Sequence, residues 1–171
     1  MEEQKILISA CLLGEKVRYD GKDSFCEHPV LQQWQRENRL VIICPEMAGG
    51  LPTPRPASQI VGNGGGAAVL QAKAKVLSAE GIDSTANYLQ GAQKALELAQ
   101  KHSVVMAILK ARSPSCGNSV IYDGSFSKSL VPGMGVTAAW LTQHGFTVFN
   151  EEQIEEAILF FNTPRLNNSK T

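Results

Sequence analysis

The chain has 171 residues, of which 43% are hydrophobic and 19% are charged, a composition typical of a folded globular domain. Its 16 Lys and Arg balance 16 Asp and Glu, so the formal net charge is +0 and we do not expect DNA or another extended polyanion as a partner. The sequence contains neither a basic leader nor a run of about 20 apolar residues, so we expect a cytoplasmic protein without a membrane span.

Four apolar runs predict the strands of a sheet, and they are residues 5–11, 40–44, 104–109 and 146–149. The runs from Leu40 to Ile43 and from Val104 to Leu109 are continuous rather than alternating. Continuous runs are typical of strands buried on both faces, as in a parallel sheet. The first run reaches Cys11, the second reaches Cys44, and the third leads through a short turn to Cys116.

Helical patterns lie between these runs. A helix is expected to begin at Pro29, a second over 85–101 and a third over 136–144, and Asn150 with Gln153 predicts a capping box before a fourth. The segment 52–80 allows a strand, a hairpin or a short helix. The alternation predicts a single α/β domain over residues 1–161, with a mainly parallel sheet flanked by helices in a Rossmann-like three-layer arrangement. Residues 162–171 are expected to form a frayed polar tail.

Three of the four cysteines are expected to meet. Cys11, Cys44 and Cys116 each end or follow a predicted strand, and the carboxyl ends of parallel strands lie along one edge of a sheet. Cys26 lies in a loop outside this pattern. No C-x-x-C pair is present and the chain is long for a disulfide scaffold, so we expect reduced thiols.

Three thiolates at one edge indicate a metal centre. A closed structural zinc site usually takes four protein ligands, whereas a sulfur-rich site also suits an iron–sulfur cluster, in which one of four irons would then lack a protein ligand. Glu46 follows Cys44 by two positions and is a candidate acid or base, and Ser113 and Ser115 offer hydroxyl groups. Cations in or beside the same loops are Arg18, Lys22, Arg55, Lys110 and Arg112.

Three other functions are compatible with parts of the sequence. Gly62, Gly64 and Ala67 match the dinucleotide-binding pattern G-x-G-x-x-A, although the segment before them is a poor strand. Cys116 is a conceivable nucleophile with a histidine as its base, although none of the three histidines lies at a predicted strand end. A zinc-binding or structural module without catalysis is the third alternative.

Four motifs resemble the bacterial thiouracil desulfidase family. They are ISACLLGEKVRYDG, CPEMAGGLPTPRP, KARSPSCG with IYDGSF, and GMGVTAAWL, and they lie in the family's order between Lys5 and Phe161. The resemblance implies a [4Fe-4S] cluster held by Cys11, Cys44 and Cys116, with one iron free to take the sulfur of a thiocarbonyl. It also implies a non-redox hydrolysis of a thiolated pyrimidine, of the 2-thiouracil, 4-thiouracil or thiouridine type, that releases hydrosulfide.

The resemblance further implies roles for single residues. The catalytic carboxylate matches Glu46 and the assisting serine matches Ser113. We expect Arg18, Ser115 and Lys110 to contact the substrate. Because the chain carries no net positive charge and no domain beyond the matched region, we expect a free base, nucleoside or nucleotide rather than tRNA as the substrate.

Overall fold

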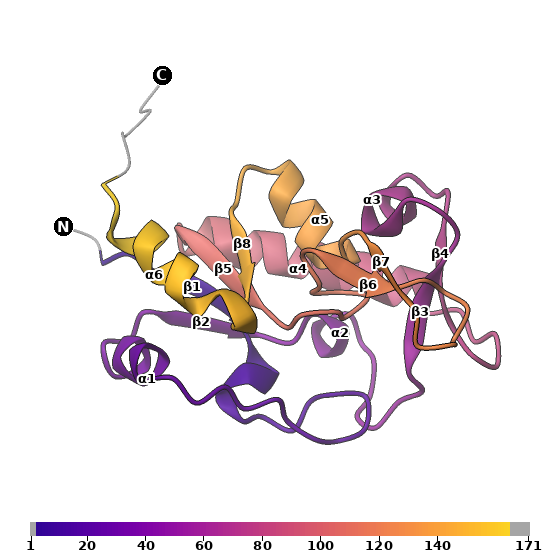
Figure 1. The fold of residues 1–171 in the computed structure, drawn as a ribbon, viewed down its shortest axis with the longest axis horizontal. Helices are drawn as coiled ribbons and strands as arrows, with labels where there is room; N and C mark the ends of the chain where they lie inside the picture. The colour runs from indigo at the N-terminus through magenta and orange to yellow at the C-terminus, as the bar shows by residue number, and fades with distance from the viewer. Residues whose placement is uncertain (1–2, 165–171) are drawn as a thin grey trace.

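A four-stranded parallel sheet forms the centre of the protein (Figure 1). The computed structural model describes residues 3–164. The strand order is β2-β1-β5-β8, and Ile6 of β1 pairs with Leu40 on one side and Met106 on the other. The four strands are β1 (Ile6–Ser9), β2 (Leu40–Ile43), β5 (Met106–Leu109) and β8 (Val148–Asn150). The mainly parallel sheet predicted from the apolar runs is confirmed.

Helices cover both faces of this sheet. On one face, Ile8 and Ile108 pack with Trp34 and Ile154. On the other face, Leu7 and Ala107 pack with Ala95 and Ala138. The helices on the first face are α1 (Pro29–Arg36) and α6 (Ile154–Asn162), and those on the second are α4 (Thr85–Lys101) and α5 (Val136–Gln143). Because both faces are covered, β1 and β5 are buried along their whole length, which explains their continuous apolar sequences.

Two antiparallel hairpins extend the domain beyond the sheet. The hairpins are β3 (Ser58–Val61) with β4 (Lys75–Ser78), and β6 (Val120–Tyr122) with β7 (Leu130–Pro132). They lie together at the end of the molecule away from the chain termini (Figure 1). Ile60, Val76 and Ile121 pack with Tyr88 of α4 and Val136 of α5, so the hairpins share a core with these helices. The undecided segment 52–80 therefore forms a hairpin whose strands are separated by α3 (Gly65–Leu70).

Several element boundaries differ from the sequence prediction by one or two residues. Strand β1 ends at Ser9, so Cys11 lies in the short helix η1 (Ala10–Leu13), and β5 begins at Met106 rather than at residue 104. The capping box of Asn150 and Gln153 is formed, around η2 (Glu151–Gln153). Helix α6 ends at Asn162, and residues 165–171 of the expected tail lie outside the described residues.

Within residues 3–164, no helix combines the length and the apolar character that a membrane crossing requires.

Candidate active site

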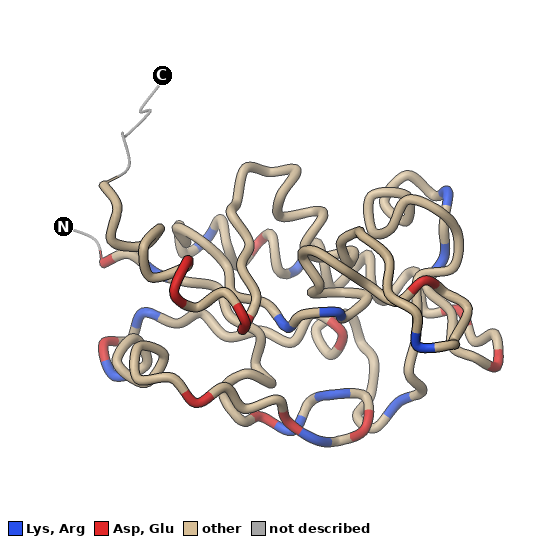
Figure 2. Tube along the Cα trace, viewed as in Figure 1, with Lys and Arg blue, Asp and Glu red and all other residues tan. Residues whose placement is uncertain are grey.

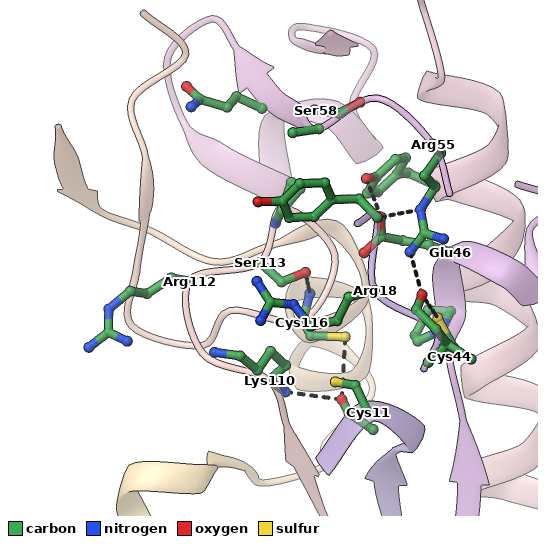
Figure 3. Close-up of a pocket in the computed structure, with 18 of the residues that line it drawn as sticks. Cys11, Arg18, Cys44, Glu46, Arg55, Ser58, Lys110, Arg112, Ser113 and Cys116 are labelled. Atoms are coloured by element: carbon green, nitrogen blue, oxygen red, sulfur yellow. Dashed lines mark hydrogen bonds and ion pairs between the residues drawn. The ribbon is translucent and has the colours of Figure 1, made fainter. Parts of the chain in front are cut away.

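The carboxyl ends of β1, β2 and β5 open into one cavity of about 490 Å³ (Figure 3). Its floor carries three thiols, one from the segment after each of these strands. Its opposite wall comes from the two hairpins, through Gln59 and Tyr122 among others. The volume lies within the range of small-molecule sites. The meeting of Cys11, Cys44 and Cys116 at one cavity agrees with the prediction from strand-end geometry.

Cys11 and Cys116 are buried in this floor. They are 8% and 4% exposed, and Ser9 at the end of β1 donates its hydroxyl hydrogen to Cys116 Sγ at 3.6 Å. Burial raises the pKa of the Cys11 thiol to about 11, from an ordinary value of 9.0, while Lys110 and Arg18 act in the opposite direction. Burial also raises the pKa of Cys116. In the absence of a bound metal cation that stabilises the thiolates, these two thiols stay protonated.

Cys44 approaches from the other side, where it precedes the short helix α2 (Pro45–Ala48). Its thiol lies 3.9 Å from the carbonyl oxygen of Val17. Burial raises its pKa too. A charge on Cys44 raises the pKa of both Cys11 and Cys116, so the three sulfur atoms share one electrostatic environment.

The spread of the thiols distinguishes between kinds of metal centre. Among the described residues, no group of three His, Cys, Asp or Glu side chains is arranged to hold a single metal ion. This arrangement does not fit a single zinc ion bound at about 2.3 Å from each sulfur. A cluster of several irons, in which each thiolate binds its own iron, fits this donor set. Cys26 does not line the cavity.

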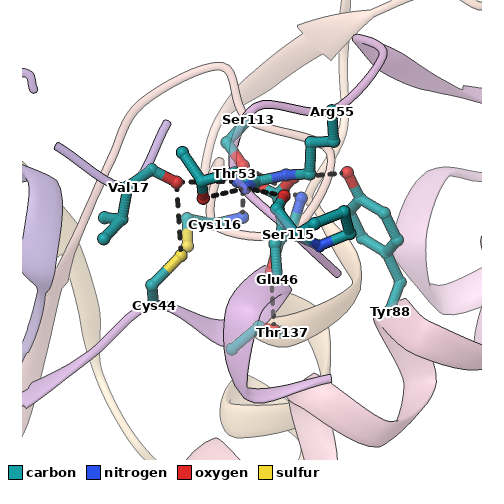
Figure 4. Close-up of polar contacts among 11 residues, drawn as sticks. Val17, Cys44, Glu46, Thr53, Arg55, Tyr88, Ser113, Ser115, Cys116 and Thr137 are labelled. Atoms are coloured by element: carbon teal, nitrogen blue, oxygen red, sulfur yellow. Dashed lines mark hydrogen bonds and ion pairs between the residues drawn. The ribbon is translucent and has the colours of Figure 1, made fainter. Parts of the chain in front are cut away.

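Glu46 lies in α2 beside Cys44, and its carboxylate is held from two directions (Figure 4). Arg55 Nε donates to Oε1 at 3.2 Å, and the Tyr88 hydroxyl donates to the same oxygen at 2.6 Å. The side chain of Glu46 is 17% exposed, so part of the carboxylate remains accessible from the cavity. The cavity therefore contains a fixed carboxylate next to the thiols.

The loop from β5 to Cys116 is shaped by the side chain of Ser113. Its Oγ accepts the backbone N–H groups of Ser115 and Cys116, both at 3.0 Å. Gly117 has an ordinary negative φ, so its backbone conformation does not require glycine. A side chain would not fit there, because a Cβ on this residue would lie 2.9 Å from the Ser113 carbonyl oxygen. The positive φ in this loop occurs at Arg112 instead, at 67°.

Ser115 does not lie where the sequence prediction placed it. The residue is 1% exposed, is absent from the cavity lining, and its hydroxyl lies 2.9 Å from Thr137 Oγ1 (Figure 4). The chain turns around the Ser113 side chain, so Ser113, Pro114 and Cys116 line the cavity while Ser115 faces Thr137 of α5. We assign Ser115 the role of anchoring this loop rather than of contacting substrate.

Most of the predicted cations line the cavity. Lys110 acts to lower the pKa of Cys11 and its Nζ pairs with Glu151 at 2.8 Å, and Arg112 pairs with Glu152 at 2.7 Å. Arg18, Arg55 and Lys128 complete the basic lining, whereas Lys22 is not part of it.

Sequence reasoning missed Ser9, Tyr88 and the hairpin residues. Ser9 could have been suggested by its position two residues before Cys11 at a strand end. Tyr88 lies 42 residues after Glu46 on the buried face of a helix, where an apolar packing role is the default expectation. Gln59 comes from a segment whose secondary structure was undecided and carried no signal, whereas Phe126 ends the family motif IYDGSF and had been given no role.

The alternative functions do not fit the geometry. Gly62 and Gly64 follow β3, which pairs antiparallel with β4 and not in a βαβ unit as a dinucleotide site requires. None of the three histidines lines the cavity around Cys116. His28 instead caps α1 and pairs with Glu155, so it is not a base for that thiol.

Comparisons with known proteins agree with this site. A family model described as 2-thiouracil desulfurase matches residues 6–153. The protein YbbK of Bacillus subtilis (strain 168), described as uncharacterized, is 40% identical over 153 residues, which are 90% of this chain and 99% of YbbK. A solved structure of the [4Fe-4S]-dependent thiouracil desulfidase TudS superimposes with a TM-score of 0.84 at 40% identity, over 93% of this chain and 98% of TudS. The chain belongs to the 2-thiouracil desulfurase family.

Proposed function

We propose that this protein is a desulfidase that hydrolyses the C=S bond of a thiolated pyrimidine with a [4Fe-4S] cluster bound to Cys11, Cys44 and Cys116. One thiocarbonyl and one water give the oxo form and hydrogen sulfide, and no electrons are supplied or removed. The observation that carries the proposal is the meeting of three thiols and one fixed carboxylate at a single cavity, in a chain 40% identical to TudS.

When bound by three thiolates, the cluster supplies an iron without a protein ligand, which acts as a Lewis acid toward the substrate sulfur. The surrounding side chains suit this negatively charged group. Lys110 and Arg18 favour the thiolate form of Cys11, and Ser9 donates a hydrogen bond to Cys116. These three residues stabilise the charge of the thiolates without occupying the ligand positions.

Glu46 is the group that moves protons. Its carboxylate accepts a proton from the attacking water and returns one to the substrate ring. Ser113 has a different role, because its Oγ already accepts two backbone N–H groups. Only its hydroxyl hydrogen is left to form a further hydrogen bond. Ser113 therefore acts as a hydrogen-bond donor to the substrate and not as a base.

The cavity favours a small substrate over tRNA. We propose a free base, nucleoside or nucleotide, contacted by Arg18 and Lys110, because the cavity has the size of a small-molecule site. Lys and Arg positions are interspersed with Asp and Glu positions along the backbone of the described residues (Figure 2), and the formal net charge of +0 does not favour a polyanion. Reduced thiols at the cluster site suit the cytoplasm.

The test is hydrosulfide release by anaerobically reconstituted protein, measured side by side with 2-thiouracil and 4-thiouridine. We expect equimolar hydrosulfide and oxo product from at least one of them. Glu46→Gln is the matched control, and it should retain its iron and lose turnover, because an amide cannot exchange protons. No hydrosulfide from either compound, in protein with about four irons per chain, contradicts the proposal.

A further inference from the structure

Both donors to Glu46 bind the same oxygen. Arg55 Nε and the Tyr88 hydroxyl converge on Oε1, at 3.2 Å and 2.6 Å, and no described residue donates to Oε2. A carboxylate held by one oxygen from two directions loses its freedom to rotate about its last bond. The two oxygens are therefore inequivalent before any substrate binds.

Both donors are themselves fixed. Arg55 is 8% exposed, and its Nη1 donates to the Pro52 carbonyl and to Thr53 Oγ1 while its Nη2 donates to the Val17 carbonyl. Tyr88 is 3% exposed, and burial together with the Glu46 charge raises its pKa well above 10.0. Its phenol therefore stays protonated at neutral pH and remains a donor.

Close packing of α2 against α4 sets the distance between Glu46 and Tyr88. A Cβ on Gly49 would lie 2.0 Å from the Asn87 carbonyl oxygen, and one on Gly91 would lie 2.0 Å from the Pro45 carbonyl oxygen. Asn87 Nδ2 also donates to the Gly49 carbonyl at 2.8 Å. The glycines allow the two helix backbones to touch, which brings the Tyr88 hydroxyl within reach of the carboxylate.

We propose that Tyr88 and Arg55 are positioning residues that hold Glu46 by Oε1 and leave Oε2 as the oxygen that exchanges a proton with the attacking water. The inference rests on the proposed function, because it concerns the orientation of the base in that reaction. Neither residue touches the substrate in this role. Each acts through Glu46, so its loss lowers the rate of the proton transfer and not the affinity for substrate.

Tyr88→Phe tests this directly, since it removes one hydroxyl and retains the ring. We expect kcat for 2-thiouracil to fall on the order of 10- to 100-fold, with KM and the iron content per chain unchanged. Gln93→Ala is the matched control, because it removes a hydrogen bond between α4 and Trp140 of α5 and involves neither α2 nor Glu46. Its kcat should equal that of the wild type.

Arg55→Lys is the second variant. It retains a cation near Glu46 but cannot donate to Oε1, Thr53 and Val17 at once, so its kcat should also fall at unchanged KM. A wild-type kcat in Tyr88→Phe overturns the proposal, as does an equal loss in Gln93→Ala or a loss of iron that accounts for the lower rate. Failure of the proposed function is distinct, because the wild-type protein itself would then release no hydrosulfide.

Discussion

Burial is the main cause of the raised pKa values of the three cavity cysteines, and it favours their protonated form in the absence of a metal. Because burial raises the pKa of each thiol, the site without a cluster holds neutral thiols and buries no negative charge there. Cluster binding requires thiolates, and the positive charge of the bound iron compensates their negative charge. Cys26 lacks the shared environment of the other three and lies outside the cavity lining. The four residues carry the same thiol group, and their positions in the fold distinguish the three candidate ligands from Cys26.

We expect Cys116→Ala to lose its iron and its turnover, because two thiolates cannot hold the cluster. Alanine fills a buried position without adding a polar group, so the fold should persist by circular dichroism. The measurement is iron and acid-labile sulfide per chain after anaerobic reconstitution. Cys26→Ala is the control and should retain both. A cluster content in Cys116→Ala equal to that of the wild type would remove Cys116 from the ligand set.

At the scale of single elements, two contacts of α4 determine how the helix begins and where it lies relative to the site. Its N-terminal turn is capped by Asp83, whose Oδ1 accepts the Thr85 N–H at 2.9 Å. Its middle touches α2 through Gly91. The cap supports the helix, and the glycine contact places the helix relative to the site.

Gly91→Ala should destabilise the protein, against the usual trend. An alanine inside a helix is ordinarily favoured over glycine by about 1 kcal/mol. Here the new Cβ would lie 2.0 Å from the backbone oxygen of Pro45, so α4 must move away from α2. We expect a net loss of roughly 1–3 kcal/mol in urea unfolding. The exposed neighbour Gln90→Ala should change little, and a more stable Gly91→Ala would show that the helices are not in close contact.

The Asp83 cap makes a pH-dependent contribution to stability. Hydrogen bonds to Thr85 lower the pKa of Asp83 below 3.8, so its contribution is complete above about 3.8 and is lost as the pH falls through the folded-state pKa. Asp83→Ala should cost about 0.5–1 kcal/mol at neutral pH. Asp83→Asn keeps the acceptor oxygen and should lose less, with no dependence on pH from this site. Equal stabilities of wild type and Asp83→Ala at neutral pH contradict the cap.

At the scale of the whole molecule, a three-layer domain supplies the floor of the site and two hairpins supply its opposite wall. The sheet and its helices form apolar clusters on both faces, and the cavity lies at their edge. Cys116 and Cys11 each belong to one of these clusters, but most of the residues that form the clusters lie outside the cavity lining. The hairpins share their own core with α4 and α5, which ties the wall to the floor.

Removal of the cluster by a chelator under reducing conditions should therefore leave the fold intact. We expect an unchanged far-UV circular dichroism spectrum with a lower Tm, because a group that binds only the native state stabilises it. Reconstitution with iron and sulfide should restore both the Tm and the turnover. Loss of the helical signal on iron removal would show instead that the cluster is required for folding.

Local pattern determined much of this protein in advance. Continuous apolar runs indicated the parallel sheet, since strands covered on both faces need no polar positions. The position of Cys11, Cys44 and Cys116 after three such runs then placed them at one edge, because parallel strands all end on the same side. Glu46 and Ser113 were candidates because they lie within three residues of Cys44 and Cys116, and the family resemblance then implied their roles.

Only the tertiary structure decided which groups act on those residues. Tyr88 and Glu46 are 42 positions apart, and their contact depends on two helix backbones touching through Gly91, which no local pattern encodes. Ser115 was placed in the cavity because of its hydroxyl, but the turn held by Ser113 directs it toward Thr137. Sequence periodicity determines which face of an element is buried, whereas the partner on that face depends on the packing of distant segments.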